Sequence, residues 1–246
     1  AALGALAALR KAPIQLAPYW RRLLVLGLIH AALPFVLIAA AEVHLSASMA
    51  AVLLAATPLM TALLSTVWLG EALTARRIVG TLVGILGVAI LMGWSPIPLN
   101  FATVLSIAAV LLASLAYAAG VLFSRKKLAD APVMTLALGQ QLAAAVWLVV
   151  PAVITAPQAT VTRGAIVSLL ALAFVCTAFA YLLLFWLIAQ IGAIKTSTVT
   201  YVIPLFGVFW GTLLLEEPLT LGMLYGLACI LMSLLLVHQR SQTPAA

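Results

Sequence analysis

Residues 47–80 read ASMAAVLLAATPLMTALLSTVWLGEALTARRIVG, and residues 193–226 read AIKTSTVTYVIPLFGVFWGTLLLEEPLTLGMLYG. The two stretches share residues in one register, 146 positions apart and without an insertion. In each, a proline lies within an apolar run, a glutamate closes that run, and Leu-Thr leads into the next one. The shared residues are Ala47, Pro58, Glu71, Leu73, Thr74 and Gly80 in the first stretch and Ala193, Pro204, Glu217, Leu219, Thr220 and Gly226 in the second. The chain therefore contains an internal repeat.

The composition is that of an integral membrane protein. Of the 246 residues, 66% are hydrophobic and 7% are charged, and the mean hydropathy is +1.29. So little polar surface cannot cover a water-soluble globule. The uncharged runs are about 18–25 residues long, enough for a helix to cross roughly 30 Å of hydrocarbon. They do not alternate polar and apolar residues as barrel strands do. We therefore predict an all-α integral membrane protein.

Eight complete spans are expected, preceded by a partial one. The spans cover residues 23–42, 47–69, 77–94, 101–124, 133–155, 164–190, 194–215 and 220–238. The first nine residues are too few to span, yet they run into Arg10 and Lys11 as the end of a helix would. We therefore expect the chain to begin part-way through a span and the full protein to have about ten transmembrane helices.

The basic residues fall on one side when the connections are taken alternately. Only Arg163 falls on the other side. An excess of Lys and Arg marks the cytoplasmic side, so we predict a multi-pass protein of the cell's inner (plasma) membrane with a cytoplasmic C-terminus. The residues on the basic side are Arg10, Lys11, Arg21, Arg22, Arg76, Arg77, Arg125, Lys126, Lys127, Lys195 and Arg240.

Counting spans gives the repeat its orientation. The span that holds Pro204 is the fifth after the span that holds Pro58, and an odd displacement reverses direction across the bilayer. Inverted repeats are typical of secondary transporters, whose substrate site lies near the midplane. We expect a first repeat, N-terminally incomplete, an outward-facing loop, a second repeat and a cytoplasmic tail. These cover residues 1–94, 95–100, 101–238 and 239–246, respectively.

Two motifs carry a resemblance to a known family. The first is Ser46-Ala47-Ser48, a small-residue run to Pro58, and Leu69-Gly70-Glu71-Ala72-Leu73-Thr74; the second is Gly192-Ala193 through Pro204 to Glu216-Glu217-Pro218-Leu219-Thr220. They resemble the signature of the drug/metabolite transporter superfamily, in its EamA-type branch of ten-helix carriers. The resemblance implies two inverted five-helix repeats, cytoplasmic termini and a central cavity that opens alternately to each side.

Polar and aromatic side chains at depth are the candidate substrate ligands, because hydrocarbon penalises polar groups. His30 lies eight residues beyond Arg22, about 12 Å into the membrane. It could line the cavity, take up a proton or pair between helices, and we leave these open. For the hydroxyl and aromatic residues, helix packing is an equally open reading. We place the substrate cavity among His30, Thr57, Tyr117, Tyr181, Trp186, Thr200 and Tyr201.

Other residues are assigned structural or gating roles. Pro34, Pro58 and Pro204 should kink their helices, and we interpret them as hinges or gates. Glu71, at the cytoplasmic face, and Glu217, at the outer face, should fix the corners of the repeats. One of Gln140 and Gln141, in mid-span, should face protein. A glycine face is expected to pack within its repeat rather than against a second subunit: Gly80, Gly84 and Gly87.

These observations favour a secondary-active transporter and not an enzyme. The chain has no phosphate-binding glycine loop, so ATP is not the direct energy source. No paired acids, metal ligands or activated nucleophile lie at depth, so we expect no catalytic residue, no metal and no cofactor. The acids lie at span ends or in loops, which disfavours a carboxylate-driven proton antiporter. Cys176 and Cys229 lie in apolar runs, and we infer no disulfide.

The substrate is the least determined feature. We expect export of amino acids or similar small metabolites by alternating access. The alternatives are a carrier or exchanger for another solute, such as a nucleotide sugar or a drug, or a non-transporting membrane sensor or scaffold. The expected partners are a small-molecule substrate and the lipid bilayer, and no nucleic acid. A coupling proton, and the choice between monomer and homodimer, stay open.

Overall fold

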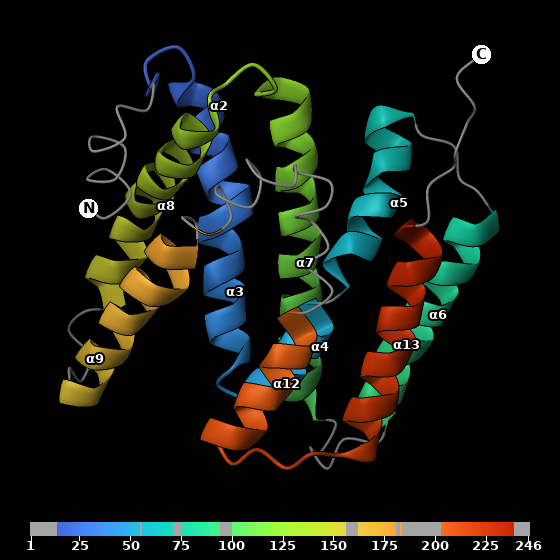
Figure 1. Ribbon diagram of the computed structural model, residues 1–246. Helices are drawn as coiled ribbons and strands as arrows, with labels where there is room; N and C mark the ends of the chain where they lie inside the picture. Colours follow the sequence, from blue (N-terminus) through green and yellow to red (C-terminus); the bar gives the residue numbers. More distant parts are fainter. Residues whose placement is uncertain are drawn as a thin grey trace. The chain divides into compact units, whose positions relative to one another are not determined.

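The computed structural model describes residues 14–54, 56–70, 75–93, 100–155, 162–180, 183 and 203–238, and these are largely helical, with no strand among them (Figure 1). Within these described ranges, four helical stretches are long and apolar enough to cross a membrane: Trp20–Ala41, Ala47–Trp68, Phe101–Lys127 and Val133–Thr155. Shorter apolar helices cover Ile78–Ile90, Arg163–Cys176, Leu205–Leu214 and Leu221–Ser233. The prediction of an all-α membrane protein is therefore confirmed.

The chain divides into two compact units, each assembled from distant stretches. The first comprises Ala1–Ala32 and Phe123–Val199, and the second comprises Leu33–Leu122 and Thr200–Ala246. Each unit thus contains parts of both sequence repeats. The chain passes from one unit to the other inside the stretch Trp20–Ala41, at Ala32, and inside Phe101–Lys127, at Leu122.

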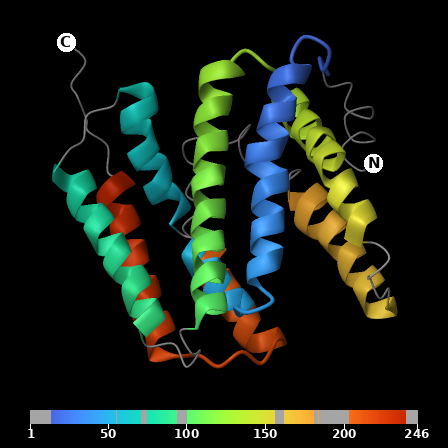
Figure 2. The ribbon, with the colours of Figure 1, turned by 180° about the vertical axis from the view of Figure 1, so that it is seen from behind.

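The first unit is built on a helix pair. It contains α2 (Trp20–Gly27), the π-helical η1 (Leu28–Ala32), α8 (Val133–Thr155), α9 (Arg163–Ala171) and the π-helical η3 (Leu172–Phe179). The helices α2 and α8 lie side by side (Figures 1 and 2). Leu23 and Leu26 of α2 are buried with Leu128. The Tyr19 hydroxyl donates to the Asp130 carboxylate at 3.0 Å, which fastens the start of α2 to the turn before α8.

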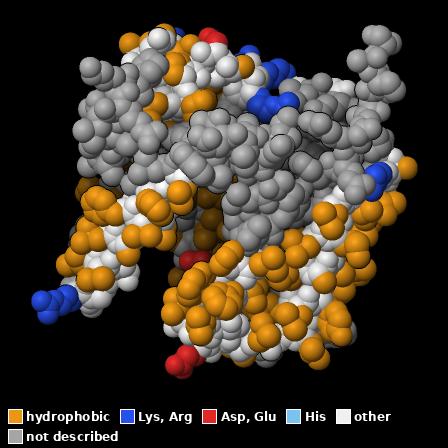
Figure 3. All heavy atoms as spheres, viewed as in Figure 1, with side chains coloured by type: hydrophobic (Ala, Val, Ile, Leu, Met, Phe, Trp, Pro, Cys, Tyr) orange, Lys and Arg blue, Asp and Glu red, His pale blue; other side chains and the backbone are white. Residues whose placement is uncertain are grey.

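The second unit surrounds a larger apolar core. It contains α3 (Leu33–Ala41), α4 (Ala47–Leu54), α5 (Thr57–Leu69), α6 (Ala75–Gly93), α12 (Ile203–Leu214), α13 (Leu221–His238) and most of α7 (Phe101–Lys127). Val52, Leu53, Val110 and Ile230 are almost fully buried in this core. The visible faces of α12 and α13 are covered by hydrophobic side chains (Figure 3), as expected for helices that face lipid.

Small residues bring α6 and α13 into close contact. A Cβ added at Gly84 would lie 2.8 Å from Ser233 Oγ, and one added at Gly87 would lie 3.0 Å from Ile230 Cγ1. In the 146-residue register, Ser233 is the counterpart of Gly87 and Ile230 is the counterpart of Gly84. Each glycine therefore faces the counterpart of the other, as across a two-fold axis.

This reciprocal contact has two consequences. Because the contacts pair higher numbers in α6 with lower numbers in α13, the two helices are antiparallel and the repeats are inverted, as predicted. The expectation that the glycine face packs within its own repeat holds only in part: a Cβ added at Gly84 would lie 2.7 Å from a Leu59 methyl of the first repeat, but Gly84 and Gly87 also meet α13 of the second repeat. The sequence identified the small-residue face but could not identify its partner.

Both repeats turn the same corner after α5 and α12. Among the described residues, only Gly70 (φ 69°) and Glu216 (φ 54°) have positive φ, and they are repeat counterparts. The Gly70 N–H bonds the Ser65 carbonyl, and the Glu217 N–H bonds that of Gly211 at 3.2 Å. Ser65 and Gly211 are counterparts as well. Equivalent carbonyls are thus satisfied at the two corners, by the N–H of the left-handed residue itself in the first copy and by the N–H of the residue after it in the second.

The first repeat proline, Pro58, lies at a helix start. The predicted kink within residues 47–69 is instead a break, because α4 ends at Leu54 and α5 begins at Thr57. Pro58 lies in the first turn of α5, where its missing N–H would have had no partner in the helix. Pro204 is the second described residue of α12, and the residues immediately before Ile203 lie outside the described ranges. The expected kink at Pro58 is therefore wrong in form, and the proline begins a new helix.

The corner geometry predicts opposite effects for two substitutions. Glu216→Gly should raise the free energy of unfolding by about 0.5–1 kcal/mol, because glycine adopts positive φ without strain. Gly70→Ala should lower it by about 1 kcal/mol, since an added Cβ meets no atom within 4 Å and backbone strain is its only cost. Denaturant unfolding in detergent measures both, with Glu216→Gln as control for loss of charge. If both variants unfolded with the same free energy as the wild type, the left-handed conformation assigned to Gly70 and Glu216 would be contradicted.

Candidate functional site

His30 lies in a widened turn of the helix. This turn, η1, separates α2 from α3, and Pro34 follows it as the second residue of α3. Proline has no N–H to offer the carbonyl four residues earlier, here that of His30, and its ring clashes with that group. A π-helical turn before the proline relieves the conflict, and such turns occur frequently at functional sites. The boundary between the two units falls at the end of this turn, at Ala32.

The widened turn recurs in the second repeat. The counterparts of residues 28–32 are residues 174–178, and these lie within the π-helical η3 (Leu172–Phe179). Cys176 is the counterpart of His30 and is exposed. The departure from α-helical geometry is therefore a property of the repeat, while the imidazole occurs in the first copy alone.

His30 pairs with an amide from α8. Its Nδ1 lies 3.2 Å from Oε1 of Gln140. Gln140 is only 7% exposed, whereas the neighbouring Gln141 is partly exposed. Sequence reasoning required one of the two glutamines to face protein but could not choose between them. The structure selects Gln140 and gives it a histidine as partner.

Close backbone contact sets up this pair. A Cβ added at Gly27 would lie 2.5 Å from Ala143 Cβ and 2.8 Å from the Gln140 carbonyl oxygen. One added at Gly139 would lie 2.6 Å from a methyl of Leu23. Small residues let membrane helices approach so closely. As a result, Gln140 on α8 comes within hydrogen-bond distance of His30, three residues beyond Gly27.

A second arrangement lies where α4 begins. The Ala47 N–H donates to Glu217 Oε1 at 2.7 Å, and the Ser48 N–H donates to Oε2 at 2.9 Å. The carboxylate thus binds two backbone donors at the positive end of a helix, where negative charge is stabilised. Glu217 comes from the link between α12 and α13, so an acid of the second repeat holds a helix of the first.

The remaining donors of this helix start are also satisfied. The Ser46 hydroxyl accepts from the Met49 N–H at 3.2 Å, as an N-cap residue does.

Glu42, at the end of α3, lies close enough to Glu217 for the two carboxylates to repel each other electrostatically. Its pKa is raised, first by partial removal of its carboxyl from water and then by the negative charge of Glu217. The sequence marked Glu217 as a corner residue but carried no local signal for its partner.

Three of the other predicted site residues, Thr57, Tyr117 and Pro34, are described by the structure, and five are not. Thr57 belongs to the second unit, and its hydroxyl donates to the Leu54 carbonyl at 2.7 Å across the break before α5. Tyr117, in α7, is partly exposed and also belongs to the second unit, whereas His30 belongs to the first. Pro34 is fully buried. The predicted residues outside the described ranges are Glu71, Tyr181, Trp186, Thr200 and Tyr201.

No metal centre is apparent in the described part of the chain, where no three His, Cys, Asp or Glu side chains gather as metal ligands would. The features that the described residues do show define another class of protein. They are apolar spans, inverted repeats, a widened turn that carries a partly buried polar pair, and a helix broken within a span. This combination defines a multi-pass helical membrane protein of the architecture that secondary transporters use.

Comparison with known proteins identifies the family. Residues 1–93 and 104–239 match the EamA-like transporter family, so the chain belongs to that family. The resemblance to the drug/metabolite transporter superfamily is thereby confirmed. The two matched segments contain the two copies of the motif that begins at Ala47 and at Ala193.

The relatives are themselves named as transporters. The uncharacterized transporter YvbV of Bacillus subtilis (strain 168) is 28% identical over 194 residues, which are 77% of this chain and 62% of that protein. An uncharacterized transporter of Archaeoglobus fulgidus is 26% identical over 203 residues, which are 81% of this chain and 70% of the relative. The chain thus spans less than two thirds of the length of YvbV.

A protein of known crystal structure shares the fold. It aligns with a TM-score of 0.67 over 99% of this chain and 85% of that chain, at 17% sequence identity. At this identity, the likeness concerns the fold alone.

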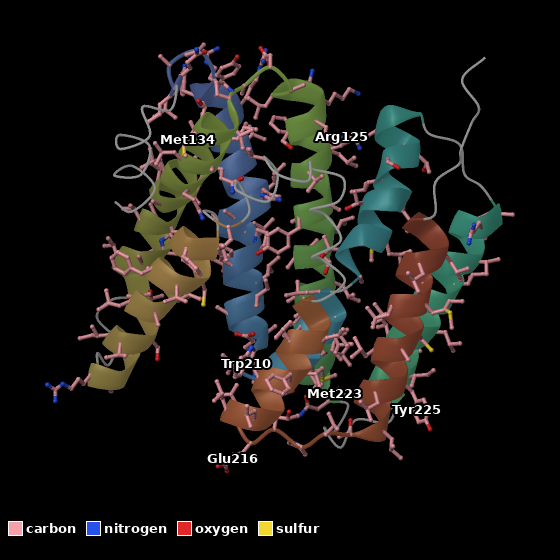
Figure 4. The ribbon with its side chains drawn as sticks, in the orientation of Figure 1. Arg125, Met134, Trp210, Glu216, Met223 and Tyr225 are labelled. Carbon is pink, nitrogen blue, oxygen red and sulfur yellow. The ribbon has the colours of Figure 1, made fainter. Side chains whose placement is uncertain are left out.

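The cap on α4 predicts a selective loss of stability. Glu217→Gln should lower the free energy of unfolding by about 1 kcal/mol, because the amide removes the charge from the helix start and can accept through one oxygen only. Glu216→Gln is the matched control, since Glu216 is exposed and points away from the end of α12 (Figure 4). Denaturant unfolding in detergent measures the difference. An equal effect of the two substitutions would contradict the cap.

Proposed function

We propose that the protein is a secondary-active carrier that exports amino acids or similar small metabolites across the cell's inner membrane by alternating access. The observation that carries this proposal is the contact of partly buried His30, in a widened, proline-flanked turn, with buried Gln140. Polar pairs at such depth are costly and usually line a substrate path. Membership of a transporter family and the inverted repeats support the same reading.

The substrate class follows from the charges that the described helices carry. The described Lys, Arg, Asp and Glu residues lie near helix ends or in connections, while the polar side chains at depth are neutral, as His30 and Gln140 exemplify. A site lined by neutral donors and acceptors suits a solute without large net charge, such as a zwitterionic amino acid. A phosphorylated anion would instead favour cationic side chains.

Alternating access needs flexible points in otherwise rigid helices. Pro34 and the turn η1 lie at the junction of the two units, where a helix continues from one into the other. We place a hinge there, because proline and π-helical geometry both weaken the local hydrogen-bond ladder. Pro58 and Pro204 are assigned as repeat-related gates. Such motions would let the inverted repeats rock about a midplane site.

Orientation follows from the basic residues. Eleven of the twelve Lys and Arg residues fall on the side that also carries the C-terminus. By the positive-inside rule, we place that side in the cytoplasm. Export then moves the solute from the basic side to the side of Arg163.

The full-length protein in proteoliposomes tests this function. Flux of labelled amino acids, sugars and quaternary ammonium compounds should show movement of one or more amino acids. His30→Ala should slow that flux about tenfold, the cost of one hydrogen bond to a solute, while folded protein remains in the membrane. His44→Ala is the control, because His44 is exposed in the turn after α3. Absence of flux for every solute would refute the carrier, and full activity of His30→Ala across pH would make His30 a packing residue.

A further inference from the structure

We propose that the contact between α4 and α12 is a latch, which holds the protein closed at the membrane face where Glu217 lies. The helix α4 belongs to the first repeat and α12 to the second. Any motion that rocks the two repeats apart at this face must therefore break the contact. The contact is a property of the fold, and its part in transport rests on the proposed function.

Two glycines of α12 bring that helix against α4 and leave no space for a side chain. A Cβ added at Gly207 would collide with the Cβ of Ala51, and one added at Gly211 would collide with Ser48 Oγ. The Ser48 hydroxyl donates to the Gly207 carbonyl at 3.5 Å. Small residues allow membrane helices to approach this closely. As a result, Ser48 is fully buried, and no solute can pass between the two helices in this conformation.

The Glu217 carboxylate fastens the edge of this contact. It accepts the N–H groups of Ala47 and Ser48 in the first turn of α4. Its Oε2 would also lie 2.7 Å from a Cβ added at Gly211, near the end of α12. Charge-assisted hydrogen bonds are about twice as strong as neutral ones. Because Glu217 follows α12 in the chain and its donors lie on α4, separation of the two helices must release both bonds.

The repeat makes this face of the membrane different from the opposite one. In the 146-residue register, Thr61 and Ser65 of α5 are the counterparts of Gly207 and Gly211. In a carrier with inverted repeats, the opposite conformation is reached when the two copies rock the other way. The helix α5 would then have to make the contact that α12 makes here, but its two residues carry the Cβ that this contact cannot hold. We therefore expect the protein to rest with the latch closed.

Thiol labelling of the full-length protein in lipid nanodiscs tests the latch without any substrate. In protein with Cys176→Ala and Cys229→Ala, Ser48→Cys should react slowly with a water-soluble maleimide, because Ser48 is fully buried. Adding Glu217→Gln should speed the reaction about fivefold, the factor that corresponds to loss of one helix cap. Glu216→Gln is the matched control and should leave the rate unchanged, since Glu216 is exposed.

A second buried position separates opening of the latch from unfolding. Ser114, on α7, is as fully buried as Ser48, and a cysteine replaces either serine with little change in volume. Labelling of Ser114→Cys should not become faster when Glu217→Gln is added. Equal acceleration at the two positions would overturn the latch, because Glu217 would then stabilise only the fold as a whole.

A reversible crosslink tests the part of the latch in transport. A Cβ added at Gly211 would lie 3.2 Å from Ser48 Cβ, close to the separation within a disulfide. An added oxidant should therefore join Ser48→Cys to Gly211→Cys, which loss of both free thiols after denaturation would measure. In proteoliposomes, with the amino acid that the wild type moves fastest, flux should stop on oxidation and return on reduction. Neither single variant should respond to the oxidant.

The outcomes distinguish this inference from the carrier proposal. If the folded double variant formed no disulfide, the close contact would be overturned. If the oxidised double variant moved solute as fast as the reduced one, the latch would be overturned while the carrier stood. A protein that shows the expected labelling rates and crosslink but moves no solute would refute the carrier and leave the contact as a conformational lock.

Discussion

Hydrocarbon offers no hydrogen-bond partner to a polypeptide backbone, and this constraint decides where the helices of this protein can break. Each break that the structure describes is supplied with its own partners. The carboxylate of Glu217 receives two N–H groups at the start of α4, and the hydroxyl of Thr57 serves the carbonyl of Leu54 before α5. The corners at Gly70 and Glu216 return N–H groups to equivalent carbonyls. Each of these departures from regular helix is therefore accompanied by its own hydrogen-bond partners.

Because the repeat is inverted, the left-handed corner and the π-helical turn each occur twice, but with different residues in the two copies. Glycine supplies the left-handed corner in one copy, and a strained glutamate supplies it in the other. Both copies widen to a π-helical turn, but only the first carries an imidazole there. Gly84 and Gly87 meet the counterparts of each other on α13, which places the internal two-fold axis between α6 and α13. The α6–α13 contact is symmetric in this sense, whereas the polar group that we assign to the substrate occurs in the first copy only.

Sequence patterns predicted much of the fold because hydrophobic length, prolines and repeated motifs are local signals. The apolar spans, the inverted repeats and the corner positions were all available in this way. The partners of those residues were not. Glu217 is 170 residues from Ala47 in sequence, and nothing local shows that they meet. Likewise, the pattern on α8 could not choose Gln140 over Gln141 without the position of α2. Pro58 indicated an interruption, but only packing shows a break rather than a kink. The roles of His30, Thr57 and Tyr117 in transport stay predictions.

The central claim is that one motif is used twice in opposite orientations across the membrane. Site-directed cysteine labelling tests it most directly, using Ala75→Cys and Leu221→Cys in protein with its native cysteines replaced. These two positions are repeat counterparts, and both are exposed at the starts of α6 and α13. A membrane-impermeant maleimide applied to intact cells should label position 221, and it should label position 75 only after permeabilisation. Labelling of both positions from the same side would contradict the inverted architecture.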